Sequence, residues 1–531
     1  MPPMRESNPL NGQIYRAIAA TIGRILLVGL LTWTSTGQLP GAEIAALRAA
    51  ATSITSNELR SHIDVLADDS FEGREAGSRG GQAAAGYLVR QLESRSLRPA
   101  GDSGTYFQSF GQGFRNILAM LEGSDPDLRS EVVILGAHYD HVGYGTQTNS
   151  YGPWGYIHNG ADDNASGVSG LLETIDALLA VQPPPKRSVL FAFFDGEEKG
   201  LLGSKHWIAR PTVPRERIMG MINVDMIGRM QQDRIEVYGT RSAFGLRRMV
   251  SECNELTRLK LDFIWEMKEN SDHYPFFAQR IPTLMVHTGL HGDYHRPSDD
   301  VERLNAAGMQ EAARFLFAVV YEMSVRPAVG PFRATAFQEQ PGHKDLLERV
   351  LGEAPPRLGV VWQKPGADQT GLVVQDVTHG SPAQRAGIRR GDRLLKFRGS
   401  SILDPERFRL EILAAPSATS LTVQREGSDQ PLDLPVELAG SPTRIGISWK
   451  DDDAEPGTVL LTQVVHGSAA HQAGLSVRDR IYAVSGKSFR DSRELRELLT
   501  THEAPLELLV ERDGQLRVTS LNVLPRGGNR P

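Results

Sequence analysis

VVILGAHYDH, residues 132–141, is a run of apolar side chains that ends in histidine and aspartate residues. An apolar run of this kind is typical of a strand buried on both faces of a parallel sheet. Comparable runs lie at 189–194, 218–224 and 282–286. Helical patterns alternate with them at 82–97, 167–179, 201–208 and 306–323. This alternation predicts an α/β domain with a mostly parallel central sheet flanked by helices.

Histidine and carboxylate residues follow nearly every predicted strand. HYD ends the first run at 138–140, DGEE follows the second at 195–198, and NVD closes the third at 223–225. ADDN at 161–164 opens a helix, and YH at 294–295 lies in the loop after the last strand. Because the carboxyl ends of parallel strands meet at one sheet edge, we expect these five segments to converge. Mixed imidazole and carboxylate ligands favour zinc, and a shared carboxylate can hold two metal ions.

Six motifs carry a resemblance to a known family: GAHYDH at 136–141, ADDNASG at 161–167, GEEKGLLGS at 196–204, NVDMIG at 223–228, SDH at 271–273 and YHRPSD at 294–299. Over about residues 59–323 the sequence resembles metallopeptidase family 28, the co-catalytic di-zinc aminopeptidases. The resemblance implies the sheet arrangement that zinc peptidases share with phosphorylases. All five metal-binding positions of the family are present in this sequence.

The resemblance implies a ligand set for two zinc ions, in which Asp163 bridges both. His138 and Asp225 then complete one metal site, and Glu198 and His295 complete the other. Two cations lower the pKa of the water between them, which makes hydroxide available near neutral pH. Cobalt and manganese also suit a site of this composition.

Three more residues are expected to take part, two of them from the resemblance and Asp140 from its spacing. Glu197 is implied to be the general base, which accepts the proton of the attacking water and passes it to the leaving amine. Asp140 lies two residues after His138, and strand geometry would project both to the same side, so we expect Asp140 to orient the imidazole. Tyr294 resembles the residue whose hydroxyl steadies the tetrahedral oxyanion.

Adjacent aspartates leave one ambiguity among the ligands, because spacing alone does not choose between Asp162 and Asp163. The family places the metal on the aspartate that precedes Asn164. Three further residues match family positions and are expected to line the pocket or to support the ligands: Asp272, His273 and Asp299.

Two alternatives share this scaffold. Glutaminyl cyclases have a similar fold, and a catalytically inactive peptidase-fold scaffold would keep it without activity; the presence of every ligand together with Glu197 argues against the latter.

A second class of co-catalytic zinc peptidases carries a lid domain between its metal motifs. Only 70 residues separate Asp225 from His295, too few for an inserted domain of roughly 100 residues with a strand and a helix.

An internal repeat follows a proline-containing segment at 327–350, which we predict to be a linker. RLGV at 357–360 recurs as RIGI at 444–447, and AGI at 386–388 recurs as AGL at 473–475, both at an offset of 87 residues. A constant offset indicates a duplicated domain rather than a solenoid. We predict two small β-rich domains over 351–440 and 441–527.

Both copies resemble PDZ domains. The resemblance implies that the entry segment presents N–H groups to the terminal carboxylate of a peptide, while a strand edge pairs with the peptide backbone. Arg357 and Arg444, just before those segments, are expected to add charge attraction. Arg478 stands where the first copy has Gly391, which leaves the shape of that turn open.

The N-terminal segment and the composition indicate the cellular setting. Three arginines precede the apolar run at 25–33, a layout typical of a signal peptide, or of an anchor if the segment is not cleaved. Cys253, as the single cysteine, forms no intramolecular disulfide. Because 64 acidic residues stand against 58 basic ones, no positive field favours nucleic acid.

The predicted protein is thus an exported, periplasmic or extracellular zinc aminopeptidase. It has an N-terminal leader over 1–42, a catalytic domain over 50–326 and the repeats behind the linker. We expect two Zn²⁺ as cofactors, peptides with a free N-terminus as substrates, and C-terminal peptides as ligands of the PDZ-like domains. A membrane is expected as a partner only if the leader stays uncleaved.

Overall fold

The computed structural model describes residues 41–111, 113–349, 356–363 and 370–524. The predicted leader over 1–42 lies almost entirely outside these residues. Within the described part of the chain, no helix combines the length and the apolar character needed to cross a membrane.

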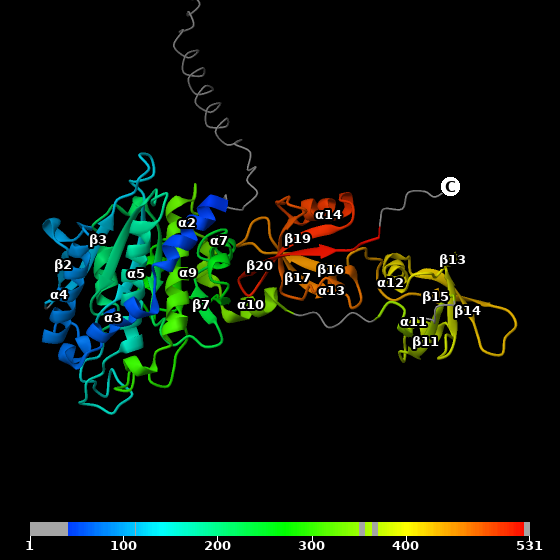
Figure 1. The fold of residues 1–531 in the computed structure, drawn as a ribbon, viewed down its shortest axis with the longest axis horizontal. Coiled ribbons are helices and arrows are strands. Elements are labelled where there is room, and N and C mark those ends of the chain that lie inside the picture. Colours follow the sequence, from blue (N-terminus) through cyan, green and yellow to red (C-terminus); the bar gives the residue numbers. More distant parts are fainter. Residues whose placement is uncertain (1–40, 112, 350–355, 364–369, 525–531) are drawn as a thin grey trace, which may run out of the picture. The chain divides into compact units, whose positions relative to one another are not determined.

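A nine-stranded mixed sheet forms the centre of the first domain (Figure 1). Its strands lie in the order β1-β3-β5-β4-β6-β9-β7-β8, with β2 paired to β3. The central strands β5, β4, β6 and β9 are parallel, as predicted, whereas β3 and β7 run antiparallel to their inner neighbours. The strand bounds are β1 Arg98–Pro99, β2 Phe107–Phe110, β3 Phe114–Leu121, β4 Val132–His138, β5 Ser188–Phe194, β6 Ile218–Val224, β7 Arg234–Tyr238, β8 Lys260–Ile264 and β9 Thr283–His287.

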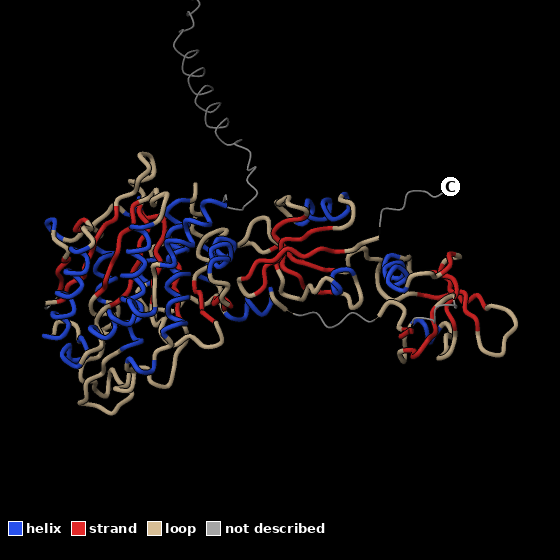
Figure 2. The backbone as a smooth tube through the Cα atoms, viewed as in Figure 1, coloured by secondary structure: helices blue, strands red, loops and turns tan. Residues whose placement is uncertain are grey.

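Helices cover both faces of this sheet (Figures 1 and 2). Alternate residues of a strand point to opposite faces, so Val133 and Leu135 of β4 enter one core while Val132 and Ile134 enter the other. This double burial explains why the central strands are continuous apolar runs. The helices are α2 Gly41–Thr52, α3 Ser56–Leu66, α4 Arg79–Ser94, α5 Gly167–Ala180, α6 Leu202–Ala209, α7 Leu246–Cys253, α8 His273–Ala278 and α9 Ala306–Val325.

The predicted elements mostly coincide with the observed ones, and the differences have local causes. The helix predicted over 82–97 begins earlier, at Arg79, because the Ser78 side chain caps it by accepting from the Gly81 amide. The predicted linker contains the short helix α10, Pro341–Leu347. Sequence analysis missed strands β1 to β3, β7 and β8 at the two sides of the sheet.

The two repeats form two antiparallel sheets, each with its own core. One edge strand of each sheet is β10, Val360–Gln363, in the first repeat and β16, Ile447–Asp451, in the second. The remaining elements of the first repeat are β11 Leu372–Val377, α11 Pro382–Arg385, β12 Arg393–Phe397, β13 Ser400–Ser401, α12 Pro405–Ala414, β14 Ala418–Gln424 and β15 Leu432–Glu437. Those of the second repeat are β17 Val459–Val464, α13 Ala469–Gln472, β18 Arg480–Val484, α14 Ser492–Thr501, β19 Leu506–Arg512 and β20 Gln515–Leu521.

Each edge strand is tied to the longer helix of its repeat by a tryptophan. Trp362 of β10 packs on Phe408 of α12 with ring centroids 5.3 Å apart. Trp449 of β16, 87 residues later, donates from its indole N–H to Ser492 of α14 at 3.0 Å. The duplication therefore extends to the contact between edge strand and helix.

The arginines before the entry segments contact the ends of the longer helices. Arg357 donates to the carbonyls of Ile412 and Ala415 at 3.1 and 2.6 Å, at the end of α12. Arg444 donates to Leu499 O at 2.9 Å, in the last turn of α14. Both guanidinium groups thus satisfy the free carbonyls at a helix C-terminus, where positive charge is also favourable.

The turn that contains Gly391 in the first repeat keeps its backbone conformation in the second repeat, where Arg478 stands at the corresponding position. Gly391 has φ +89° and Arg478 has φ +76°, so both residues adopt the left-handed conformation. A side chain makes this conformation costly for arginine by about 1–2 kcal/mol. The Arg478 guanidinium donates to Glu348 O at 3.2 Å, which offsets part of that cost.

Buried ion pairs join residues of the second repeat to residues of the first domain. Arg247 of α7 and Glu511 of β19 are paired at 3.0 Å, and both are largely buried. Asp452 is buried between the guanidinium groups of Arg241 and Arg480. Burial alone would raise the pKa of Asp452, but the two guanidinium groups outweigh it and lower the pKa to about 2.

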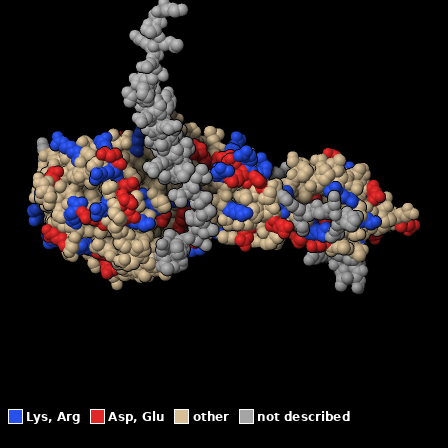
Figure 3. Space-filling view, turned by 90° about the horizontal axis from the view of Figure 1, so that it is seen from above, with Lys and Arg blue, Asp and Glu red and all other residues tan. Residues whose placement is uncertain are grey.

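Charged side chains of both signs are interspersed on the face drawn in Figure 3. Elsewhere in the described chain, solvent-accessible ion pairs include Arg79 with Glu72 and Lys205 with Glu269. Exposed pairs of this kind contribute little to stability, because water and salt screen them.

Candidate metal centre

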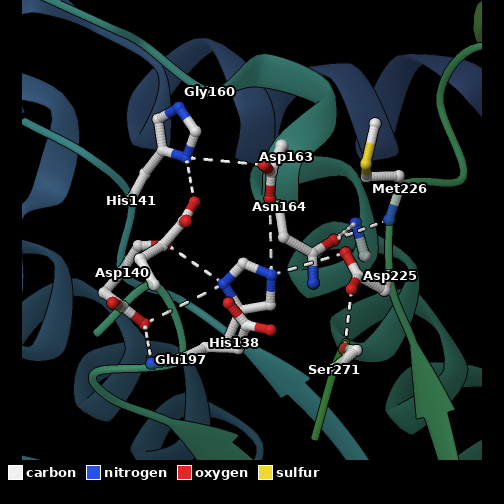
Figure 4. A network of polar contacts seen from close by, with 12 residues as sticks. His138, Asp140, His141, Gly160, Asp163, Asn164, Glu197, Asp225, Met226 and Ser271 are labelled. Atoms are coloured by element: carbon white, nitrogen blue, oxygen red, sulfur yellow. Dashed lines mark hydrogen bonds and ion pairs between the residues drawn. The ribbon is translucent and has the colours of Figure 1, made fainter. Parts of the chain in front are cut away.

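A first cluster of ligand atoms joins β4, the loop before α5 and the end of β6. His138 Nε2 lies 3.4 Å from Asp163 Oδ1 and 3.4 Å from Asp225 Oδ1. Figure 4 shows these three side chains facing one another. All three are buried.

A second cluster uses the other oxygen of Asp163. His295 Nε2 lies 3.0 Å from Asp163 Oδ2 and 3.1 Å from Glu198 Oε2. His141 Nδ1 lies 2.7 Å from Glu198 Oε1 and 3.7 Å from Asp163 Oδ2. Asp163 therefore stands between the two clusters and offers one oxygen to each.

His141 is the residue of this centre that sequence analysis did not single out. It lies in the GAHYDH motif, three residues after His138, but no role was assigned to it. Its side chain is fully buried and reaches Glu198 and Asp163, whereas the predicted set had Glu198 and His295, but not His141, on that side. Its position directly after Asp140, as the third polar side chain with His138 and Asp140, is the signal from which sequence analysis could have found it.

The loop that carries Asp163 is fixed by its neighbours. Asn164 donates from Nδ2 to Val224 O at 3.1 Å, and its Oδ1 accepts from the Met226 amide at 3.0 Å, which ties the loop to the end of β6. Asp299 accepts from the Asp163 amide at 3.0 Å. Asp299 thus holds the backbone of the loop that carries Asp163.

The geometry separates the two adjacent aspartates. Asp162 accepts from the Ser166 hydroxyl at 2.8 Å and from the Gly228 amide at 2.6 Å, and its second oxygen lies 3.2 Å from His291 Nε2. Its carboxylate is therefore occupied away from both clusters. Asp163 is the aspartate that faces the ligand histidines.

Asp140 lies beside His138 but contacts it through the main chain. His138 Nδ1 is 3.2 Å from Asp140 O and 3.9 Å from the carboxylate. Asp140 Oδ1 instead accepts from the Glu197 amide at 3.1 Å. The carboxylate expected to orient the imidazole therefore positions the segment that carries Glu197.

Glu197 and Tyr294 lie at the edge of the clusters. Burial raises the pKa of the Glu197 carboxyl well above its ordinary value, and the His138 charge opposes this shift. The Tyr294 ring stacks on His295 with centroids 3.9 Å apart, and burial raises the pKa of its hydroxyl. Both side chains adjoin the predicted ligands.

Asp272 and His273 lie outside the two clusters. Asp272 accepts from the Ser204 hydroxyl, and burial raises its pKa to about 6. Burial lowers the pKa of His273 to about 4. Asp225, by contrast, accepts from the Ser271 hydroxyl at 2.7 Å, so the SDH motif reaches the cluster through its serine.

A buried arginine joins the segments around the centre. Arg74 donates to the carbonyls of Leu66, Tyr139, Asn159 and Gly160 at 2.6–3.0 Å. Burial lowers the pKa of its guanidinium to about 10, so it stays charged at neutral pH. Sequence analysis gave no role to Arg74.

The donor set fits two divalent cations. In a tetrahedral zinc site with ligands at about 2.1 Å, neighbouring ligand atoms lie about 3.4 Å apart. The separations of 3.0–3.4 Å around His138 and His295 agree with this edge length. His295 Nε2, which faces Asp163 and Glu198, is buried and makes no hydrogen bond of regular geometry with either carboxylate. Buried carboxylates this close together are costly unless cations neutralise them.

Comparisons with known proteins match three segments of the chain. The family described as "Peptidase family M28" matches residues 116–320. Two families described as "PDZ domain" match residues 356–436 and 460–512. These segments fall on the mixed sheet and on the two antiparallel sheets.

Individual relatives are distant. A "Probable leucine aminopeptidase" of Arthroderma benhamiae is 27% identical over 215 residues, 38% of this chain and 56% of the relative. "Aminopeptidase YwaD" of Bacillus subtilis is 28% identical over 207 residues, 36% of this chain and 41% of the relative. The chain thus spans about half the length of these relatives. The solved structure of "Legionella pneumophila LapA aminopeptidase" is 19% identical, covers 56% of this chain and 78% of that chain, and has a TM-score of 0.46.

Proposed function

Because the chain carries a peptidase family M28 domain followed by two PDZ domains, we propose that it is a zinc-dependent aminopeptidase that removes N-terminal residues from peptides. The observation that carries this proposal is the pair of buried ligand clusters that share Asp163, with Glu197 beside them. A shared carboxylate between two mixed His and carboxylate sites suits two-metal hydrolysis.

Five side chains would hold the two ions in this proposal. His138, Asp163 and Asp225 surround one position, and Asp163, Glu198 and His295 surround the other. His141 adds a further imidazole on the second side. Bound zinc would polarise the scissile carbonyl and lower the pKa of a nearby water.

The chain's own residues would then move the proton. Water oxygen bonds to the scissile carbonyl carbon while Glu197 accepts a water proton. When the carbon–nitrogen bond breaks, Glu197 gives that proton to the leaving amine nitrogen. Asp140 keeps the base in place through its hydrogen bond with the Glu197 amide. The Tyr294 hydroxyl is proposed to donate to the oxyanion.

One set of measurements tests the proposal. Zinc content is determined, and hydrolysis of aminoacyl anilides is compared for wild type, Glu197→Gln and Glu302→Gln, with and without chelator. Glu302 is an exposed glutamate of the same domain and serves as the matched control. We expect about two zinc ions per chain, loss of 10²-fold or more in kcat for Glu197→Gln, and wild-type rates for Glu302→Gln.

Three results would redirect the proposal. A metal-free and inactive preparation would favour a scaffold with a peptidase fold. Release of ammonia from N-terminal glutamine, without hydrolysis of anilides, would favour a glutaminyl cyclase. Cleavage of N-acetylated peptides as fast as free ones would exclude an aminopeptidase.

Two further parts of the proposal concern the setting. The PDZ domains are proposed to bind C-terminal peptides along the free edges of β10 and β16, which supports a role in recruiting substrates or partner proteins. The arginine-rich, apolar N-terminal segment supports export. Mass spectrometry of the mature N-terminus in membrane and soluble fractions tests cleavage and location together.

A further inference from the structure

Four exposed aromatic side chains lie in one loop beside the metal centre. Tyr144, Tyr151, Trp154 and Tyr156 expose 48–65% of their surface. Only two other large aromatic side chains of the described residues are exposed to a comparable degree, Phe244 and Phe337. We call the four residues the aromatic rim.

The rim is attached to the metal centre by its backbone. The Tyr151 amide and the Ser150 hydroxyl both donate to the carbonyl of His295, at 3.1 and 3.0 Å. Arg296 donates to the carbonyls of Tyr151 and Gly152 at 2.9 and 3.0 Å. The backbone of the loop is therefore fixed while its aromatic rings remain exposed.

The rim also adjoins the reacting side of the centre. The Tyr151 ring centroid lies 6.1 Å from that of Tyr294 and 6.3 Å from that of His295. One extended residue spans about 3.5 Å, so a peptide held at His295 passes Tyr151 within about two residues. Tyr151 thus adjoins the proposed catalytic site, and the other three rings of the rim lie in the same loop.

Burial decides which part of a substrate meets the rim. His138, Asp163 and Asp225 are buried, and the side chains of His295 and Glu198 are only 15 and 7% exposed, so the scissile carbonyl has to enter the centre. An aminopeptidase takes the amino end of its substrate inward, and the rest of the chain then leaves toward solvent. Exposed rings at the exit contact the residues that follow the scissile bond.

We infer that the aromatic rim binds the second and following residues of the substrate, and that it selects peptides with apolar or aromatic side chains at those positions. The inference rests on the proposed aminopeptidase activity. Aromatic rings bury large apolar surfaces against such side chains, and tyrosine hydroxyls can also pair with the peptide backbone. Polar or glycine-rich chains gain little from these rings.

Two substrates with the same first residue test the inference in the zinc-loaded full chain. Leu-Phe-Phe-Ala and Leu-Ser-Gly-Ala are compared with leucine anilide for wild type, Trp154→Ala/Tyr156→Ala and Leu403→Ala. Leu403 is an exposed apolar residue of the first repeat and serves as the control. In wild type, KM should be about 5- to 20-fold lower for the aromatic peptide than for the polar one.

The rim variant should lose most of this preference through KM, and Leu403→Ala should keep it. A preference that stays within two-fold of wild type in the rim variant overturns the inference. A dimer that dissociates in the rim variant also overturns it, because a second copy would then cover the rings; sedimentation velocity detects this.

A binding measurement keeps the two proposals separate. If wild type hydrolyses neither anilide nor peptide, the aminopeptidase proposal fails. Binding of both peptides to zinc-loaded Glu197→Gln, measured by calorimetry, then tests peptide selection by the aromatic rim independently of catalysis. Equal dissociation constants for the aromatic and the polar peptide would refute it.

Discussion

Replacement of Arg74 by methionine should destabilise the first domain strongly. Its guanidinium donates to four carbonyls, of Leu66 at 2.7 Å, Asn159 at 2.6 Å, and Tyr139 and Gly160 at 3.0 Å. Hydrogen bonds to a charged donor contribute roughly 1.5–3 kcal/mol each, or about 6–12 kcal/mol in total. Removal of the buried charge recovers several kcal/mol of desolvation, so we expect a net loss of about 3–5 kcal/mol.

Urea unfolding of zinc-free protein measures this loss without the contribution of bound metal. Arg79→Met is the matched control, because Arg79 lies five residues later, is 77% exposed and pairs with Glu72 at 2.5 Å. An exposed pair of this kind contributes about 0–1 kcal/mol. In thermal unfolding the Arg74 variant should melt roughly 6–15 °C lower than wild type.

The same variant should bind zinc more weakly, because three of the four carbonyls adjoin ligand-bearing segments. Tyr139 follows His138, and Asn159 and Gly160 precede the Asp163 loop. Competition with a chelating dye measures the affinity. If Arg74→Met and Arg79→Met lost equal amounts of stability and kept equal zinc affinity, the reasoning about the buried guanidinium would be refuted.

Three further outcomes follow from the structure. Because the pKa of Asp452 is lowered, its ion pairs stabilise the protein fully above the ordinary aspartate pKa and lose this effect as the pH falls from about 4 to 2. The difference in unfolding free energy between wild type and Asp452→Asn, measured in urea, should therefore narrow by about 2 kcal/mol over that range. A difference that stays constant would contradict the assignment. Asp140→Ala should lower kcat about 10- to 100-fold with little change in KM. Asp140→Asn should recover part of the lost kcat, because its amide oxygen still accepts from the Glu197 amide. If steady-state kinetics showed no recovery, the charge of Asp140 would matter more than this hydrogen bond. Gly391→Ala should destabilise the first repeat by about 1–2 kcal/mol, because φ at this position is +89°. Urea unfolding followed by tryptophan fluorescence measures this loss, and an unchanged midpoint would show that the turn relaxes instead.

The central strands were predictable because burial on both faces leaves a continuous apolar run, as in β4 and β5. The outer strands β7 and β8 were missed because they alternate polar and apolar residues over only five positions. A half-exposed strand of that length carries a weak signal in sequence.

The candidate site was predictable as a set of residues, but its detailed contacts were not. The strand ends identified His138 and Asp225, whereas the direction of the Asp162 side chain depends on the hydroxyl of Ser166 and the amide of Gly228, which both donate to its carboxylate. Residue spacing does not show these contacts. The carboxylate of Asp140 turned to a backbone amide for a similar reason. Such contacts are set by tertiary packing and have no local pattern.

The arginine caps of the two repeats have a consequence for ligand kinetics. Arg357 fastens the entry segment to the end of α12, and Trp362 fastens the neighbouring strand to the same helix. The proposed peptide-binding site between β10 and α12 would therefore already be formed before a peptide arrives. Association should then be a single exponential in stopped-flow traces, with an observed rate that rises linearly with peptide concentration and reaches no plateau.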